Sequence, residues 1–568
     1  MSHLKKAYVF LLLLTIFIVS NWSLIDYTKF YRGHDPTHSS RIAEMSRALE
    51  DGHFPVRWTE NFGFGYGMPL FEFYAPLPFY LGSFLYWLNL DMSLVINILY
   101  MISGLTALLG SYKLASKLFG SSAGLVAAAA FTLAPYRAVN IFVRGAMSEA
   151  WGIMIMPWIL LEIVLILENR KNKKAWILLV LSLLVMMLSH NLTTLMFVPV
   201  SLIFAVFYAL YTGAINWKKK RLVNSVFKII SAYLLSIGLT AFYLFPAFLE
   251  KDFTKISSIL EGYFHYSHHF LYIRQFLIPS WGYGGSAWGP DDGISFFLGY
   301  GQLLALIISV LVLIQIFAKK IRSKKEIVSF FKNHSIYIFF GLAFIFSLYL
   351  SLLKSQWIWN NLLLINFIQF PWRWLTVAIL FLSLINAYAV TLIKSKVRRY
   401  LFSFILIFVL LLNGRYFSFD ESKKDSWEIA CVSEECIREK MSPILPDYIY
   451  INQEPDIEPV KVGEITDHDT EILVNRGHEK LFRVRSEFDE KININIAAYP
   501  GWKVEIDGEG VDWETPLCQG FGNIIVEVPA GDHQVGVYFG YTPVRFWSDI
   551  ISFLSLLIFL YLILDIKK

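Results

Sequence analysis

The chain has 568 residues, of which 56% are hydrophobic and 17% charged, and its mean hydropathy is +0.50. A soluble protein could not bury so large an apolar fraction in its cores, so the composition indicates a polytopic membrane protein. The formal net charge of +5 comes from short basic clusters between hydrophobic runs, which indicates membrane orientation and excludes nucleic-acid binding as its cause.

The first hydrophobic segment runs from Ala7 to Leu24 and follows Lys5-Lys6. It is longer than the core of a usual signal peptide, and no small-residue cleavage site follows it. We therefore expect an uncleaved first transmembrane helix with its N-terminus in the cytoplasm.

A polar stretch then begins with Gly33-His34-Asp35-Pro36 and continues to about Tyr74. Pro36 suits the first turn of a helix, so the sequence predicts a helix to Glu50, with Asp35 at its N-cap. Asp35 is either only this cap or the acid at the centre of an active site. The apolar residues of the helix share one face, as in a helix that lies on a bilayer: Ile42, Met45 and Leu49.

The rest of this stretch combines glycines with aromatic residues, most densely from Phe62 to Pro69. Glycines let a backbone turn sharply and approach a ligand, and aromatic rings suit the headgroup region. The short apolar segment that ends near Asn89 is predicted to be re-entrant or interfacial, because a full span there would reverse the side of every later basic loop.

Hydropathy predicts about twelve spans in total. After the first helix they are Met92 to Tyr112, Ala123 to Tyr136, Ala150 to Leu167, Ala175 to Leu188, Leu192 to Tyr211, Val226 to Leu249, Ile294 to Phe317, Ile336 to Leu353, Trp372 to Ile393, Val397 to Asn413 and Phe546 to Leu564. With the N-terminus inside, the basic clusters at 170–174, 218–221, 319–322, 394–399 and 567–568 all lie in the cytoplasm.

The same orientation divides the chain into a transmembrane domain, 1–413, an extracytoplasmic β-rich domain, 414–545, and a last helix with a cytoplasmic tail, 546–568. The outer loops of the first domain are then 25–91, 137–149, 250–293 and 354–371. Within 414–545, five segments alternate as strands and predict a small β-sandwich: Leu481 to Val484, Ile492 to Ile496, Trp502 to Ile506, Ile524 to Val528 and Gln534 to Phe539. Cys431 and Cys436 could form a disulfide outside the cytoplasm or remain thiols.

Glu149 enters the fourth span from the outer side, where an unpaired carboxylate costs about 2 kcal/mol or more. It therefore needs a partner. Either Glu149 and Asp35 share one cavity, as base and metal ligand or as base and orienting group, or Glu149 forms an ion pair with Arg144 or Arg137.

Other outer residues allow two interpretations each. His190 could line the cavity or only stabilise a turn, and His265 and His269 could bind a divalent cation, together with Asp35 and Glu149, or form a polar interfacial cluster. Arg57 and Arg373 lie beside tryptophans, where each could hold a phosphate or only reach lipid headgroups. The candidate substrate-binding residues are His34, His38, Arg57, Tyr74, Arg144, His190, Arg274 and Arg373.

The blocks Gly33 to Asp35, Pro55 to Trp58, Gly65 to Pro69 and Phe73 to Leu77 resemble bacterial membrane proteins classed as 6-pyruvoyl-tetrahydropterin synthase-related. Segments 144–149, 189–193 and 369–373 are similar to further motifs of that family. The ending Tyr499 to Val504, with Pro529 to His533, is similar to the C-terminal part of YfhO-type membrane proteins.

Both groups resemble the GT-C superfamily of polytopic glycosyltransferases. The resemblance implies that an acid in the first outer loop serves catalysis, at the position of Asp35, and that the donor is a sugar on a polyprenyl phosphate. The chain lacks the Asp-x-Asp pattern of the second outer loop, where only Glu149 stands, so dependence on a divalent cation stays open. The expectation is an enzyme of the plasma membrane that transfers a sugar to an extracytoplasmic cell-wall or surface polymer or lipid.

Two other functions are compatible with the sequence. A transporter or flippase of lipid-linked sugars predicts ionisable groups near the middle of the membrane, whereas most such groups here lie at the outer interface. A non-catalytic scaffold would use the β-rich domain to bind surface polymer.

Overall fold

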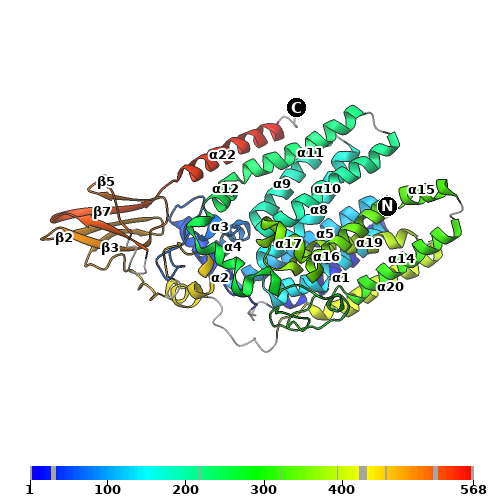
Figure 1. Ribbon diagram of the computed structural model, residues 1–568, viewed down its shortest axis with the longest axis horizontal. Coiled ribbons are helices and arrows are strands. Elements are labelled where there is room, and N and C mark those ends of the chain that lie inside the picture. Colours follow the sequence, from blue (N-terminus) through cyan, green and yellow to red (C-terminus); the bar gives the residue numbers. More distant parts are fainter. Residues whose placement is uncertain are drawn as a thin grey trace.

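The computed structural model describes residues 3–26, 33–169, 171–216, 219–320, 323–392, 395–420, 431–454, 457–515 and 522–564. Figure 1 shows the strands at one end of the molecule and a bundle of long helices behind them, with α2, α3 and α4 between the two. Parts of the basic clusters used to orient the chain lie outside the described residues, namely Arg170, Lys218, Arg322, Lys394 and Lys567–Lys568.

The helices account for most of the described chain. They are α1 His3–Ile25, α2 His38–Glu50, α3 Leu70–Phe73, α4 Leu77–Trp87, α5 Met92–Phe119, α6 Ser121–Thr132, α7 Pro135–Ala138, α8 Met147–Glu168, α9 Lys173–Ser189, α10 Asn191–Asn216, α11 Lys219–Leu239, α12 Ala241–Leu249, α13 Ile273–Leu277, α14 Tyr300–Lys320, α15 Lys324–Asn333, α16 Ser335–Ser351, α17 Gln356–Asn361, α18 Leu363–Asn366, α19 Leu375–Leu392, α20 Ser395–Asn413, α21 Glu434–Cys436 and α22 Pro543–Leu564.

Within the described residues, seven helices are long and apolar enough to cross a membrane, or ten if each of three bent pairs is one span. The bent pairs are α6 with 135–143, the 225–239 part of α11 with α12, and α15 with α16. The predicted count of about twelve is therefore not confirmed, because the spans expected in α9 and α20 do not meet this criterion. The membrane class itself is confirmed.

The helices of the bundle differ in burial, which shows which of them lie at its centre and which at its edge. Helices α8 and α19 are almost completely buried, whereas α1, α14 and α22 leave most of their apolar residues exposed. Exposed apolar helices of this length suit contact with lipid chains, and the buried pair forms the centre of the bundle.

Helix α2 differs from its prediction in two ways. It begins at His38 with Thr37 as N-cap, not at Pro36, although it ends at Glu50 as expected. It also does not lie on a bilayer, because its polar face is covered: Arg41 and Glu44 are each 2% exposed. Glu44 accepts hydrogen bonds from the backbone and side chain of Asn61, at 3.0 and 2.8 Å, and α4 packs on the apolar face.

The C-terminal region contains the five predicted strands and two more. They form a five-stranded antiparallel sheet in the order β1-β2-β7-β4-β5 and a two-stranded sheet, β3-β6. The bounds are β1 Glu471–Arg476, β2 Glu479–Ser486, β3 Glu490–Ala497, β4 Trp502–Ile506, β5 Glu509–Val511, β6 Asn523–Val528 and β7 Gly531–Phe539. Alternating apolar residues of β2, β3, β4, β6 and β7 bury one common hydrophobic cluster.

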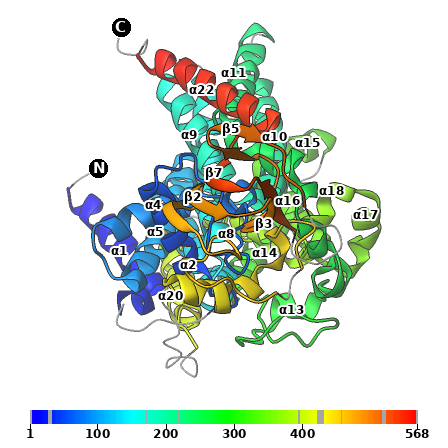
Figure 2. The same ribbon diagram turned by 90° about the vertical axis from the view of Figure 1, so that its left-hand side faces the viewer.

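The first outer loop completes that cluster. Trp58 belongs to the same buried cluster and packs edge-on against Trp502, with ring centroids 5.3 Å apart. Viewed from the strand end, as in Figure 2, the β-strands lie across the front of α2, α5 and α8. The β-rich region is therefore docked on the segment that follows α2 and is not a free appendage.

Candidate active site

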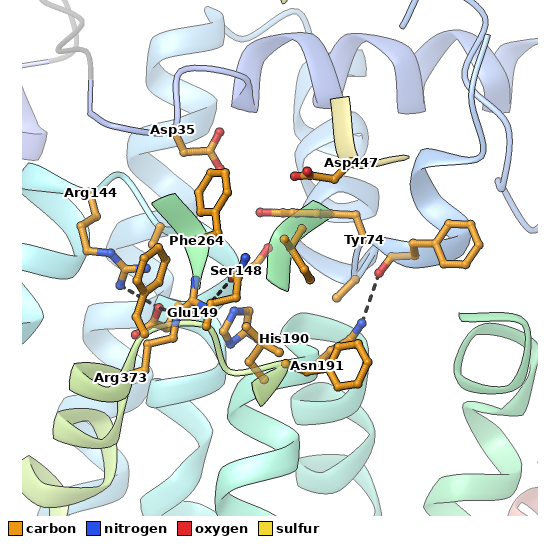
Figure 3. Close-up of a pocket in the computed structure, with 18 of the residues that line it drawn as sticks. Asp35, Tyr74, Arg144, Ser148, Glu149, His190, Asn191, Phe264, Arg373 and Asp447 are labelled. Atoms are coloured by element: carbon orange, nitrogen blue, oxygen red, sulfur yellow. Dashed lines mark hydrogen bonds and ion pairs between the residues drawn. The ribbon is translucent and has the colours of Figure 1, made fainter. Parts of the chain in front are cut away.

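A cavity of about 1010 Å³ is lined by the starts of α8 and α10, by α12 and by the loops around them (Figure 3). Seven of the ten residues expected to be catalytic or substrate-binding line it: His34, Asp35, Tyr74, Arg144, Glu149, His190 and Arg373. The two carboxylates that the sequence singled out, 114 positions apart, thus face one cavity.

Backbone contacts bring Asp35 to this position. The amide of His34 donates to the carbonyl of Val143 at 3.1 Å, and the amide of Asp35 donates to that of Arg144 at 3.0 Å. Only glycine fits where the two loops cross, since a Cβ on Gly33 would lie 2.8 Å from the amide nitrogen of Gly145. These contacts fix the first outer loop to the start of α8.

Asp35 is a partly accessible carboxylate of the cavity, with 27% of its side chain exposed. Its Oδ2 accepts from Arg41 at 2.8 Å and its Oδ1 from the Thr37 hydroxyl at 2.7 Å. Burial acts to raise the pKa of Asp35, but Arg41, with smaller contributions from His38 and Thr37, holds that pKa well below its usual range. Asp35 is therefore an ionised hydrogen-bond acceptor.

His38 contacts the backbone next to Asp35 from the buried side and does not line the cavity. It is 4% exposed, and its Nε2 hydrogen-bonds to the carbonyl of Gly145. The hydroxyl of Tyr100 lies 3.4 Å from the same nitrogen. His38 thus positions the backbone next to Asp35.

Glu149 is enclosed by donors. Its Oε2 accepts from Arg144 at 2.7 Å and lies 3.6 Å from Nε of Arg373, and its Oε1 accepts from the Tyr136 hydroxyl at 2.9 Å. Only 1% of its side chain is exposed. Glu149 thus lines the same cavity as Asp35 and is paired with Arg144, whereas Arg137 donates to the carbonyl of Thr132.

The two arginines are themselves held in place by aromatic rings. The guanidinium of Arg144 lies 4.6 Å from the ring centroid of Trp372, and that of Arg373 lies 4.8 Å from that of Phe370. Gln369 adopts a left-handed backbone conformation, φ 63°, and accepts from Arg373 at 2.8 Å. Two cations thus share one carboxylate at one end of the cavity.

His190 combines its two expected roles. It lines the cavity, and its Nδ1 accepts from the amide of Thr193 at 3.1 Å at the start of α10. Burial lowers the pKa of His190 to about 3 although Glu149 acts in the opposite direction. His190 is therefore neutral and serves as a polar contact.

Three predicted substrate-binding residues lie elsewhere. His38 supports the loop, Arg57 pairs with Asp549 of α22 at 2.5 Å, and Arg274 pairs with Asp291 on an exposed loop. None of the three is among the residues that line the described cavity.

The candidate cation ligands do not fit a divalent-cation site. Asp35 and Glu149 are bonded to arginines, and His269 bonds Ser286 and the Tyr263 carbonyl through its two nitrogens, each at 2.5 Å. Among the described ranges, no group of three histidine, cysteine or acidic residues is placed to hold a metal ion.

Apolar side chains form another part of the lining, the apolar wall. Three of them remain open to the surroundings: Phe248 is 61%, Leu364 58% and Phe264 39% exposed. The members of this wall are Leu192, Leu195, Leu244, Phe248, Ile256, Ile259, Phe264, Leu364 and Phe367. The cavity therefore joins a charged end to an exposed apolar surface.

Sequence reasoning missed three charged residues that line the cavity, Arg41, Lys251 and Asp447. The charge of Arg41 fits the amphipathic pattern of α2 and gave no sign of a role in the site, yet Arg41 binds both Asp35 and the Tyr74 hydroxyl. Asp447 comes from the segment before the strands and also lines the cavity. No motif surrounds Asp447, so no signal in the sequence distinguished it from other surface acids.

Comparisons with known proteins give distant similarities. No family model matches the chain. An uncharacterised protein of Lactococcus lactis subsp. cremoris (strain MG1363) is 28% identical over 233 residues, which cover 38% of this chain and 36% of that protein. The chain therefore spans little more than a third of this relative.

Two kinds of solved structure are similar in shape. The arabinofuranosyltransferase AftD from Mycobacteria matches with a TM-score of 0.44 and 14% identity, over 72% of this chain and 26% of its own. The Archaeoglobus fulgidus oligosaccharyltransferase matches with a TM-score of 0.42 and 13% identity, over 76% and 58%. TM-scores this low establish neither a common fold nor a common activity.

Proposed function

We propose that this protein is a membrane glycosyltransferase that moves a sugar from a polyprenyl-phosphate donor to a hydroxyl group of an extracytoplasmic acceptor, such as a cell-wall or surface glycopolymer or a lipid. The observation that carries the proposal is the cavity itself. An accessible ionised carboxylate, Asp35, faces the same space as a pair of buried arginines and an exposed apolar wall.

The charged end suits the phosphate of the donor. Arg144 and Arg373 share the single carboxylate of Glu149, which leaves one positive charge uncompensated within the cluster. A sugar bound to a polyprenyl phosphate is a phosphodiester with one negative charge, and guanidinium groups bind phosphate oxygens through paired donors. Glu149 then positions both arginines and is not itself the base.

The apolar wall suits the carrier. A polyprenyl chain cannot leave the bilayer, so its phosphate must be reached from the membrane side. The exposed Phe248, Phe264 and Leu364 provide an apolar path from the lipid to the arginine pair.

Asp35 is placed to serve as general base. The acceptor hydroxyl would attack the anomeric carbon, the bond from that carbon to the phosphate oxygen would break, and the phosphate would leave with the electron pair. The hydroxyl proton would pass to Asp35. A carboxylate with so low a pKa accepts this proton only when bond formation has made the hydroxyl strongly acidic.

The proposal includes a membrane arrangement. Residues 1–413 would form the transmembrane domain with both ends of the chain in the cytoplasm, and residues 414–545 would lie outside the plasma membrane with the catalytic cavity. Residues 546–568 would return the chain to the cytoplasm.

The direct test is transfer from labelled polyprenyl-phosphate sugars by the purified protein in lipid nanodiscs, with envelope fractions as acceptor. We expect Asp35→Asn to lower the rate by at least about a hundredfold, the range of general-base catalysis. Asp35→Glu keeps the charge but moves the carboxylate by one methylene group, so its transfer rate shows whether the position of the carboxylate matters. The matched control is Asp512→Asn, which removes an exposed carboxylate of the β-rich region. Transfer by Asp35→Asn at the wild-type rate would remove Asp35 from the mechanism.

A further inference from the structure

Asp447 presents a second accessible carboxylate to the cavity. It lies in the helical turn Pro446–Tyr448, and its Oδ1 accepts from the Ser258 hydroxyl at 2.7 Å. Among the described residues, no other hydrogen bond to this carboxylate is found, so Oδ2 remains able to accept one. Glu149, by contrast, has both oxygens occupied.

The segment that carries Asp447 is held rigidly. Arg438, which is 4% exposed, donates to Asn61 at 2.8 Å and to the carbonyls of Val460 and Lys461. Tyr450 forms an antiparallel bridge with Thr254. The turn is therefore fixed between the first and third outer loops, as a binding residue on a loop requires.

Two tyrosines complete this corner of the cavity. Tyr448 packs edge-on against Tyr74, with ring centroids 6.1 Å apart, and the guanidinium of Arg41 lies 4.0 Å from the Tyr74 ring centroid. A carboxylate acceptor beside fixed aromatic rings offers the two features that a saccharide needs, hydrogen bonds for its hydroxyls and flat apolar surface for its C–H groups.

The position of Asp447 in the cavity indicates which of the two substrates it would contact. In the view of Figure 3, Asp35 lies at the top of the cavity, the group Arg144, Glu149 and Arg373 lies at its lower left, and Asp447 with Tyr74 lies at its right. In an inverting displacement the nucleophile attacks opposite the leaving group. With the phosphate at the arginines and the base at Asp35, the Asp447 corner is the place for the acceptor.

We propose that Asp447, Tyr448 and Tyr74 form an acceptor subsite that binds a hydroxyl-bearing saccharide; the assignment to the acceptor, and not to another sugar, rests on the proposed function. Burial raises the pKa of Asp447 above its ordinary range although Ser258 acts against it. A carboxyl group of this kind can accept a hydrogen bond from one hydroxyl and, when protonated, donate one to another.

The test measures two kinds of binding by the full-length protein in nanodiscs. One probe is an array of bacterial envelope oligosaccharides, and the other is fluorescent polyprenyl phosphate. We expect Asp447→Asn and Tyr448→Ala each to weaken oligosaccharide binding by about tenfold or more, the usual loss for one hydrogen bond to a charged group or one aromatic contact. Polyprenyl-phosphate binding should stay at the wild-type level in both.

Ser258→Ala is the control for a purely structural role, because it removes the bond between the loops but keeps the carboxylate. We expect it to bind oligosaccharide within about threefold of wild type, a loss in the range of one neutral hydrogen bond. The subsite would be refuted if Asp447→Asn bound as wild type, if Ser258→Ala reproduced its loss, or if the wild type bound no saccharide. Binding of saccharide that depends on Asp447, without binding of polyprenyl phosphate, would refute the proposed transfer and retain the subsite.

Discussion

Asp35 and Glu149 carry the same chemical group into the same cavity, but their neighbours give them different properties. Asp35 has one arginine and an accessible edge, whereas Glu149 lies between two arginines and a tyrosine. The first can meet a substrate, and the second can only orient its neighbours. The environment, and not the residue type, decides which acid is available for chemistry.

Replacement of Glu149 by glutamine tests its structural role. The variant leaves Arg144 and Arg373 without their counter-ion in a buried site, so we expect the free energy of unfolding to fall by about 3–5 kcal/mol. Reversible unfolding in mixed micelles measures it. Glu168→Gln, which removes the half-exposed partner of Lys117, is the matched control and should cost less than about 1 kcal/mol. Equal losses in the two variants would show that Glu149 is not a buried counter-ion.

The sequence could predict part of this site at the level of residues. An acid just after the first span and an acid entering a later span are recognisable because charge is costly at those positions. Arg41 was missed because an amphipathic pattern cannot tell a solvated face from one covered by a loop distant in sequence. Asp447 depends entirely on long-range packing, with Ser258 as its described hydrogen-bond partner.

At the scale of elements, the site depends on how closely α8 approaches α10. Gly152 of α8 faces Thr193 of α10, and a Cβ on this glycine would lie 2.9 Å from the Cβ of Thr193. Thr193 in turn hydrogen-bonds His190. The distance between α8 and α10 therefore determines where His190 lies in the lining of the cavity.

Gly152→Ala tests this packing. The added methyl group must push the helices apart, and we expect a loss of about 1–3 kcal/mol in the free energy of unfolding. Gly341→Ala in α16 is the matched control, since nothing lies within 4 Å of its Cβ position and alanine favours a helix by about 0.5–1 kcal/mol over glycine. Thermal unfolding of both variants measures the two changes in stability, which should have opposite signs. An unchanged stability of Gly152→Ala would contradict the close approach of α8 to α10.

Element boundaries show where sequence patterns reach their limit. The end of α2 at Glu50 follows from Asp51-Gly52, but its start was displaced because Asp35 binds Arg41 and Thr37 and leaves the N-cap to Thr37. Strands β2, β3, β4, β6 and β7 were predicted from alternation. Strand β1 was missed because its side chains are mostly exposed and carry little pattern.

At the scale of the whole molecule, one buried arginine joins several distant parts of the chain. The Nε of Arg545, at the start of α22, lies 3.0 Å from a carboxylate oxygen of Glu72 and 3.0 Å from one of Glu250. The Tyr499 hydroxyl, after β3, donates to Glu72 at 2.8 Å. The first outer loop, the end of α12, the β-rich region and α22 therefore meet at one point.

This junction makes stability depend on pH. Burial, together with the nearby Glu250, raises the pKa of Glu72 from 4.5 to about 8 despite the opposite effect of Arg545. Between these values the folded chain holds a proton that the unfolded chain has lost, so stability falls as the pH rises from about 5 to about 8. Unfolding midpoints across this range measure the slope, and Glu72→Gln should flatten it. Glu509→Gln, at an exposed position of β5, should leave it unchanged; a slope that persists in Glu72→Gln would assign it to another group.

The disulfide between Cys431 and Cys436 tests the proposed orientation. Such a bond persists in an oxidising compartment, so we expect it in protein taken directly from cells. The protein is denatured in detergent under conditions that prevent thiol–disulfide exchange but leave free thiols reactive. A polyethylene-glycol maleimide should then add once per chain without reductant and three times with it, since the chain has three cysteines. Three additions without reductant would place this segment in the cytoplasm.

The position of Arg545 in the chain has a consequence for biosynthesis. It is translated 295 residues after Glu250, which accepts its hydrogen bond at 3.0 Å, and later still after Glu72. Until the ribosome has released α22 and the translocon has inserted it, these two acids have no cation at the junction. This junction therefore cannot form before α22 is inserted, and a product truncated before α22 would leave Glu250 without the cation that it contacts in the folded chain.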